Sequence, residues 1–200
     1  MRIIAGTKRG MTLSCPKTWA TRPITDRVKE SLFSVLQSYD LLNGAKVVDL
    51  FCGVGSLGLE ALSRGAAFVT FVERDPDVLE SLGKNIARAG FGPRSRVIRA
   101  SVFQVAAPLV GAGEPEHDLV FIDPPYAATS EVGGGSSLAD LLRILENQVA
   151  ARGVIVVRTR RDVALLDRYG RFRIADQRRW GTMSITLLQA RTDEQEAGCD

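Results

Sequence analysis

From Ala45 onward, short apolar runs of strand length alternate with longer stretches in which apolar residues recur at helical spacing. Such alternation is typical of a mostly parallel sheet with helices on both faces. A closing antiparallel pair makes the expected sheet a mixed one, so the pattern predicts an α/β fold with seven strands. These strands are expected at Lys46–Phe51, Phe68–Val72, Val97–Arg99, Leu119–Ile122, Val154–Val157, Phe172–Gln177 and Ser184–Gln189.

Polar caps, prolines and glycines mark the expected helix boundaries. Thr25 and Asp26 are good helix starters, and the apolar spacing that follows predicts a helix to about Gln37. Asp75 followed by Pro76 predicts an N-cap with proline at the first helical position. The other expected helices cover Gly55–Arg64, the stretch from Pro76 to near Gly90, Val102–Val110 and Leu138–Ala150, and a flexible glycine-rich loop is expected at 127–137.

The two ends of the chain differ from this pattern. Residues 2–13 alternate weakly around Gly6 and Gly10, which predicts two short strands joined by a turn. The residues from Thr192 are polar and predict a disordered tail. We therefore expect a basic hairpin extension at 1–24, one α/β domain at 25–190 and a tail at 191–200.

The net charge of +3 is distributed unevenly. The first 30 residues hold seven Lys or Arg residues and only two acidic ones. A second basic cluster lies between Arg158 and Arg179. Both clusters suit a phosphate backbone, although a solvated surface would have the same composition, and the roles of the second cluster stay open.

The chain has three cysteines without CxxC spacing and a single histidine, which argues against a disulfide framework or a zinc site. We expect His117 on an exposed loop and Cys52 as a small buried residue. No apolar run approaches the length of a membrane span, and the first residues lack the apolar core of a signal peptide. These features predict a cytoplasmic protein without a metal or a membrane partner, and a monomer is the default expectation.

The segment from Asp49 to Gly58, DLFCGVGSLG, joins the first strand to the next helix. Its GxGxxG spacing permits close approach to a nucleotide, but it also fits a turn that binds nothing. Asp49 is expected beneath this loop, where it could hold the ammonium group of S-adenosylmethionine, which NAD lacks, or orient the loop amides. Glu73, at the end of the second strand, is expected to accept hydrogen bonds from ribose hydroxyls, unless it is a surface acid paired with Arg74.

The tetrapeptide Asp123-Pro124-Pro125-Tyr126 directly follows the apolar run LVFI. Ligands bind at the carboxyl ends of strands in such sheets. The Asp123 carboxylate or the Pro124 carbonyl could orient an exocyclic amine, and the prolines would fix that acceptor in place. Tyr126 offers a flat face for an extruded base. The motif therefore predicts a methyltransferase that acts on a planar NH2 group.

With DPPY, the run DLFCGVGSLGLEALSRGA has the pattern of N6-adenine and guanine-N2 methyltransferases. The N-terminal residues RIIAG (2–6), Arg9-Gly10 and RPITDRVKESLF (22–33) closely resemble the 16S rRNA guanine-N2 methyltransferases of the RsmD type. The resemblance extends over residues 1–190 and includes FVERD (71–75) and Gly181.

The resemblance implies a Rossmann-like class I methyltransferase domain at 25–190, which uses S-adenosylmethionine to methylate the N2 amine of one guanine in 16S rRNA of the small ribosomal subunit. It also implies that the hairpin and the segment from Arg22 hold RNA and close over the cofactor. The residues expected for catalysis are Asp123, Pro124, Pro125 and Tyr126; for the cofactor, Asp49, Phe51, Gly53, Gly55, Glu73, Arg74, Ser101 and Asp123; and for RNA, Arg2, Lys8, Arg9, Arg22, Thr25 and Arg27.

Two positions depart from the family pattern. Ser101 stands where many methyltransferases have an acid that binds the adenine amino group, so Ser101 or a backbone carbonyl would have to make that contact. Trp180 stands where a tyrosine is frequent, and we expect it to pack on the sheet. DNA adenine or a protein amide as substrate, a nonenzymatic RNA-binding protein on this fold, and a nicotinamide oxidoreductase are the alternatives.

Overall fold

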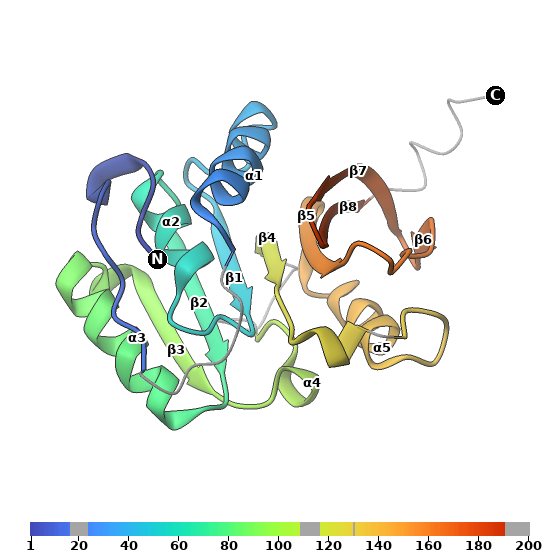
Figure 1. Ribbon diagram of the computed structural model, residues 1–200. Coiled ribbons are helices and arrows are strands. Elements are labelled where there is room, and N and C mark those ends of the chain that lie inside the picture. Colours follow the sequence, from blue (N-terminus) through green and yellow to red (C-terminus); the bar gives the residue numbers. More distant parts are fainter. Residues whose placement is uncertain (17–23, 109–116, 130, 191–200) are drawn as a thin grey trace. The chain divides into compact units, whose positions relative to one another are not determined.

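The computed structural model describes residues 1–16, 24–108, 117–129 and 131–190. The chain divides into two compact units, Met1–Gln104 and Val105–Asp200, and each is described by itself (Figure 1). No helix in the described ranges is long and apolar enough to cross a membrane. The expected tail at 191–200 lies outside the described residues.

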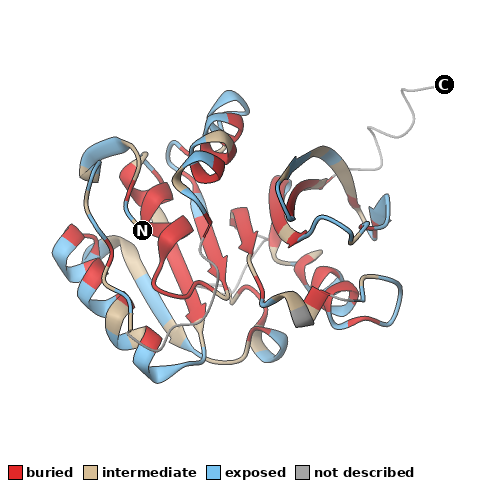
Figure 2. Cartoon of the chain, viewed as in Figure 1, coloured by how far each residue is buried: buried red, intermediate tan, exposed pale blue. Residues whose placement is uncertain are grey.

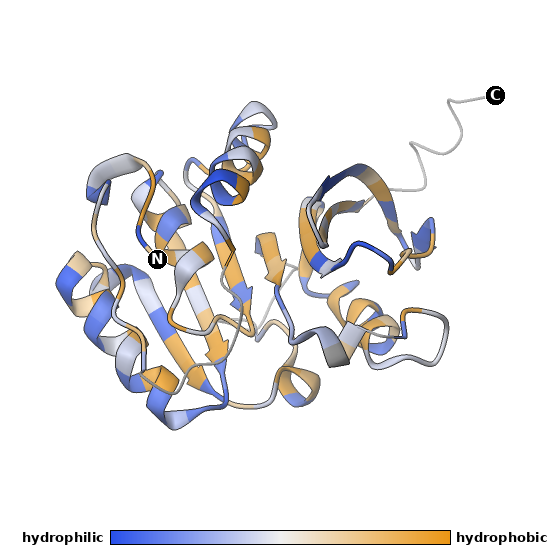
Figure 3. Ribbon diagram, in the orientation of Figure 1, coloured by the Kyte–Doolittle hydropathy of each residue, from blue (hydrophilic) through white to orange (hydrophobic). Residues whose placement is uncertain are grey.

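The first unit is built on three parallel strands in the order β3-β2-β1. Strands β1 and β2 are largely hydrophobic and buried, as continuous apolar runs predict for strands covered on both faces (Figures 2 and 3). Helix α2 contacts both of them, and α3 contacts the more exposed β3. The elements are α1 (Asp26–Ser38), β1 (Lys46–Leu50), α2 (Ser56–Ser63), β2 (Phe68–Glu73), α3 (Pro76–Ala89), β3 (Ser95–Arg99) and α4 (Val102–Val105).

The caps expected from the sequence are present. The Thr25 side chain accepts a hydrogen bond from the Val28 amide at the start of α1 (3.4 Å). Asp75 caps α3 by accepting from the amides of Asp77 and Val78 (2.9 and 3.2 Å). Each cap satisfies amides that the first turn of a helix leaves unpaired, so the chain fixes these helix starts locally.

The second unit has the strand order β4-β5-β8-β7-β6, in which only β4 and β5 are parallel. The antiparallel pair around Gly181 is confirmed. The described residues contain eight strands, one more than expected, because two-residue β6 is too short to leave a hydrophobic pattern. The elements are β4 (His117–Ile122), the 3-10 turn η3 (Tyr126–Thr129), α5 (Ser137–Leu145), β5 (Val149–Arg160), β6 (Arg168–Tyr169), β7 (Phe172–Trp180) and β8 (Met183–Ala190).

Two expectations for this unit are wrong. Helix α5 ends at Leu145 rather than Ala150, because Val149 already pairs with the start of β4. His117 is 2% exposed and begins β4, whereas an exposed loop was expected. Its backbone amide donates to the Gln148 carbonyl (3.2 Å), and β4 therefore begins two residues before the apolar run.

The N-terminal residues form a hairpin, but in place of the two expected strands they have a single bridge between Arg2 and Thr12 and a 3-10 turn, η1, at Gly6–Lys8. The hairpin lies directly against α2, and Gly6 has φ +78° there. A Cβ atom at Gly6 would lie 1.8 Å from the Ser63 carbonyl oxygen, so no larger residue fits without moving the backbone. The hairpin is thus packed into the first unit, while the boundary at residue 24 remains a prediction.

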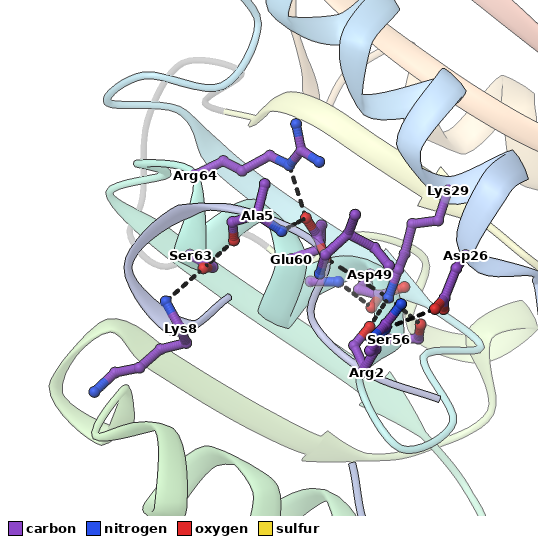
Figure 4. A network of polar contacts seen from close by, with 12 residues as sticks. Arg2, Ala5, Lys8, Asp26, Lys29, Asp49, Ser56, Glu60, Ser63 and Arg64 are labelled. Atoms are coloured by element: carbon purple, nitrogen blue, oxygen red, sulfur yellow. Dashed lines mark hydrogen bonds and ion pairs between the residues drawn. The ribbon is translucent and has the colours of Figure 1, made fainter. Parts of the chain in front are cut away.

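A buried carboxylate fastens this hairpin (Figure 4). Glu60 is fully buried on α2 and accepts hydrogen bonds from the amides of Ile4 and Ala5 (2.7 and 3.0 Å). It also pairs with Arg64 (2.7 Å) and with Lys29 of α1 (3.6 Å between Nζ and Oε2). One carboxylate therefore holds the hairpin, α1 and α2 together, and its charge is matched by two cations.

Lys29 is the second fully buried charge in this network. Its ammonium group donates to the Arg2 carbonyl (2.5 Å) and to the Ser56 hydroxyl (3.3 Å) at the start of α2. Burial lowers the pKa of Lys29, and the neighbouring Glu60 and Asp26 act in the opposite direction. The lysine of the expected RNA-binding segment is therefore a structural residue.

Replacing Glu60 with glutamine should lower the free energy of unfolding by about 3 kcal/mol, because it leaves the buried Lys29 charge without its carboxylate. Urea denaturation measures this loss. Glu80→Gln is the matched control, since Glu80 and Lys84 form an exposed pair (2.6 Å) that water and salt screen, so its loss should change stability little. Equal effects of the two substitutions would contradict the structural role of Glu60.

Candidate functional site

The loop between β1 and α2 has an unusual backbone. Phe51, Gly53 and Gly55 have φ values of +58°, +54° and +87°. Gly55 packs so closely that a Cβ atom there would lie 2.6 Å from Leu82 Cδ1. The conformation brings main-chain groups to the carboxyl end of β1, where ligands bind in α/β sheets.

Asp49 lies beneath this loop, as the sequence predicts. Its carboxylate is 1% exposed and accepts a hydrogen bond from the Gly58 amide in the first turn of α2 (2.8 Å). A carboxylate near the first turn also interacts favourably with the helix dipole. Asp49 therefore orients helix amides, which is one of the two roles that the sequence offers for it.

Glu73 ties the end of β2 to the same loop. Its Oε2 atom accepts from the Gly53 amide (3.2 Å), and its Oε1 atom accepts from the amides of Arg74 and Asp75 (2.7 and 3.0 Å). Arg74 thus contributes its backbone to the site. A carboxylate offers about four acceptor positions, so Glu73 can still accept one hydrogen bond from a ribose hydroxyl.

Two phenylalanines flank the position after β3. The rings of Phe51 and Phe103 meet edge to face, with centroids 5.5 Å apart. Phe103 is 42% exposed, which is unusual for a side chain of this size. The neighbouring Ser101 carbonyl already accepts from the Gln104 amide (2.9 Å). The site therefore offers an aromatic surface that would suit an adenine ring, and no pattern in the sequence points to Phe103.

These features fit S-adenosylmethionine. Glu73 retains an acceptor position that a ribose could use, and Phe51 with Phe103 presents a flat apolar surface, whereas the buried Asp49 is engaged with the Gly58 amide. Cys52 is buried as expected, and burial raises the pKa of its thiol well above the usual value, which argues against a nucleophilic role. Within the described ranges, no group of three or more His, Cys, Asp or Glu residues could hold a metal ion.

The tetrapeptide 123–126 follows β4 in the second unit. The Asp123 carboxylate forms an ion pair with Arg158 of β5, and their side chains are only 19% and 12% exposed. The Arg158 guanidinium also lies over the Tyr126 ring, 5.8 Å from its centroid. Arg158 therefore contacts both ends of the tetrapeptide, while Pro124 is buried and Pro125 is exposed between them.

Arg158 is a site residue that the sequence analysis left unassigned among the basic residues of 158–179. The signal that could have found it is its position directly after the apolar run VIVV, where a charged residue can be partly buried. Burial raises the pKa of Asp123, and the Arg158 charge opposes that rise. Arg158 thus stabilises the ionised form of the carboxylate.

The residues expected to contact RNA lie in the first unit, except Arg22, which is outside the described residues. Arg2 pairs with Asp26 across an exposed surface (2.8 Å). Arg9 and Arg27 are exposed, Lys8 is half-buried, and Thr25 caps α1. The structure therefore places the basic side chains on the hairpin and at the start of α1, which the Glu60 network joins.

Comparisons with known proteins agree with this architecture. Residues 1–189 match the family model described as "Conserved hypothetical protein 95". The chain is 31% identical over 191 residues to the "Putative rRNA methyltransferase YlbH" of Bacillus subtilis, a match that covers 96% of this chain and all of that protein. It is 42% identical over 126 residues to "Ribosomal RNA small subunit methyltransferase D" of Escherichia coli, which covers 63% of this chain and 60% of that protein.

The chain belongs to this family of RsmD-type methyltransferases. The solved structure described as "Putative methyltransferase yhhF from Escherichia coli" is 33% identical, with a TM-score of 0.77 over 96% of this chain and 98% of that one. The mixed α/β methyltransferase fold expected from the sequence is therefore confirmed. S-adenosylmethionine, the methyl donor of such enzymes, is confirmed as the cofactor.

Replacing Phe103 with alanine should raise the Kd for S-adenosylmethionine about tenfold, because stacking of a base on an aromatic ring is worth roughly 1–3 kcal/mol. Isothermal titration calorimetry measures this change. Tyr39→Ala removes an aromatic side chain that is 54% exposed elsewhere in the first unit, and its Kd should equal that of the wild type. An unchanged Kd in Phe103→Ala would exclude Phe103 from the cofactor site.

Proposed function

We propose that this protein transfers a methyl group from S-adenosylmethionine to the exocyclic N2 amine of one guanine in 16S rRNA of the small ribosomal subunit. The observation that carries the proposal is the arrangement of Asp123, Arg158 and Tyr126 at the end of β4. Similarity to the small-subunit rRNA methyltransferase of Escherichia coli supports an RNA substrate.

The amine of guanine is a weak nucleophile because its lone pair is delocalised into the ring. In this proposal the Asp123 carboxylate and the Pro124 carbonyl accept hydrogen bonds from the two amine hydrogens. These hydrogen bonds favour a tetrahedral nitrogen, whose lone pair is then available for attack. Because Arg158 and the two prolines hold these acceptors, little reorganisation is needed as the reaction proceeds.

Positioning supplies most of the catalysis in this proposal. S-adenosylmethionine carries an activated methyl group on a sulfonium ion, so no metal and no covalent enzyme intermediate is required. Tyr126 stacks against the extruded base and fixes its plane. The amine nitrogen would form the new N–C bond as the S–C bond breaks and S-adenosylhomocysteine leaves, and the proton that the nitrogen then loses would pass to the Asp123 carboxylate.

The basic surface of the first unit supports RNA rather than a protein amide as the substrate. Arg9 and Arg27 are exposed, and Arg2 is exposed beside Asp26. The hairpin that carries Arg9 is joined to α2, the helix that follows the cofactor loop. RNA bound to the hairpin would therefore contact an element that is rigidly connected to the cofactor loop.

The function is tested with tritiated S-adenosylmethionine and 30S particles, or 16S rRNA, from a strain that lacks the modification. Mass spectrometry of the digested product should identify N2-methylguanosine at a single site. Asp123→Ala should lose methylation by at least 100-fold while binding S-adenosylmethionine normally, because it removes a preorganised acceptor. Asp123→Asn keeps the size of the side chain and controls for misfolding.

Label in N6-methyladenosine would retain the mechanism and overturn guanine as the target. Label in DNA or protein, with none in rRNA, would overturn RNA as the substrate. Near-normal turnover in both Asp123 variants would contradict the catalytic role of the carboxylate.

The pH dependence of methylation should reveal the ionisation of Asp123, which the ion pair with Arg158 influences. The ionised Asp123 carboxylate is the stronger acceptor for its amine hydrogen, so activity should fall as the pH drops through the pKa of Asp123, which burial raises above its usual value. Arg158→Gln removes the charge that lowers this pKa, so the acid limb of kcat/KM should move to higher pH. At neutral pH we expect roughly a tenfold loss.

Arg143→Gln is the matched control, because Arg143 forms an exposed pair with Asp140 on α5 (3.1 Å). Its pH profile should coincide with that of the wild type. An Arg158→Gln profile with an unshifted acid limb would show that the ion pair does not set the ionisation of Asp123.

A further inference from the structure

The second unit contains a pocket of about 660 Å³ beside the catalytic tetrapeptide. This volume lies within the range of ordinary small-molecule sites and is large enough for a nucleotide. The pocket brings together the tetrapeptide, the end of β5 and the turn between β7 and β8. Its lining residues are Tyr126, Arg160, Arg161, Asp162, Gly181 and Thr182.

Hydrogen bonds between the end of β5 and the β7–β8 turn shape one wall of the pocket. The Arg161 amide donates to the Thr182 carbonyl (2.9 Å), and the Arg161 guanidinium donates to the Gly181 carbonyl (3.4 Å). Gly181 has φ +53°, which allows the sharp turn. Arg161 is thus held at the pocket while most of its guanidinium N–H groups stay available to an anion.

Arg160 lies on the same wall with a fixed orientation. Two parallel hydrogen bonds join its guanidinium to Asp162 (3.0 and 2.8 Å), and its side chain remains 57% exposed. The lining residues include two arginines and one aspartate, so the pocket carries a net charge of +1. Planar guanidinium groups bind phosphate oxygens with defined geometry, which favours a phosphate as the ligand.

Tyr126 provides a second and independent indication of a ligand. Its hydroxyl oxygen is buried and has no hydrogen-bond partner among the described residues. Buried polar atoms are nearly always paired in native structures, so an unpaired hydroxyl on a residue that lines the pocket points to a partner that comes from a ligand. A nucleotide could supply this partner through its ribose or its phosphate.

We propose that this pocket binds the ribose and phosphate of the nucleotide whose base is methylated, with Arg161 and Arg160 contacting the phosphate. The inference rests on the proposed function, because it assumes that the base stacks on Tyr126. An extruded base must be rotated out about its own backbone, and a phosphate anchor next to the base-stacking residue holds the rotated state. Phosphate contacts of this kind position RNA without reading its sequence.

The test compares Arg161→Ala with Arg152→Ala, which removes an exposed arginine from the opposite end of β5. Fluorescence anisotropy measures the binding of a single-stranded oligoribonucleotide, taken from the methylated loop, at several salt concentrations. Arg161→Ala should raise the Kd about tenfold and lower the slope of log K against log salt by about one. Arg152→Ala should match the wild type in both.

Steady-state kinetics separate binding from chemistry. In Arg161→Ala the KM for RNA should rise by a similar factor, while kcat and the Kd for S-adenosylmethionine change little. Arg161→Lys retains the charge and should recover most of the salt slope, which a merely structural role of the Gly181 hydrogen bond would not produce. Thermal unfolding of each variant checks that the fold is intact.

The binding measurement does not require methylation, so the two proposals can fail separately. If the wild type methylates rRNA and Arg161→Ala behaves like Arg152→Ala, the pocket proposal is overturned and the function stands. If Arg161→Ala weakens RNA binding but the wild type methylates no RNA, the pocket remains an RNA site and the proposed function fails. If the wild type binds no RNA at all, both are overturned.

Discussion

The buried Glu60 carboxylate is the interaction on which the first unit depends. It accepts hydrogen bonds from two backbone amides of the N-terminal hairpin and forms ion pairs with Lys29 of α1 and Arg64 of α2. Isolated buried charges are costly, and this one is tolerated because each oxygen is paired. The consequence is a rigid connection between the basic hairpin and the helix that begins at the glycine loop. A surface suited to RNA and a loop suited to a cofactor are therefore parts of one packed body.

In the second unit a carboxylate is likewise matched by a cation, in the partly buried ion pair of Asp123 and Arg158. In the proposed mechanism Asp123 accepts a hydrogen bond from the amine most strongly when it is ionised, yet its burial disfavours the charge. Arg158 compensates, and it also lies over the Tyr126 ring. One arginine thus sets both the charge of the acceptor and the environment of the stacking residue. The neighbouring Arg160 and Arg161 extend this positive surface to the pocket that we assign to the substrate phosphate.

The glycine loop shows why a short motif is informative only in context. GxGxxG alone fits several nucleotide cofactors and also a turn that binds nothing. Asp49 and Glu73 lie at the ends of adjacent parallel strands and fasten the loop through the amides of Gly58 and Gly53. The half-buried Phe51 and the exposed Phe103 add an apolar surface that would suit an adenine ring. These side chains come from three separate segments, and only the fold brings them together.

The sequence by itself determined the fold class, the helix starts at Thr25 and Asp75, the glycine loop and the DPPY tetrapeptide, because each depends on local patterns or short-range hydrogen bonds. It did not determine the burial of His117, the early end of α5 or the short β6, because strand pairing extends beyond the apolar run that signals it. Glu60, Lys29 and Phe103 likewise carry no local signature, and for Arg158 the only local signal is its position directly after the apolar run VIVV. Their roles depend on partners distant along the chain, and a charge becomes structural only when the tertiary structure removes its water and supplies a counter-charge.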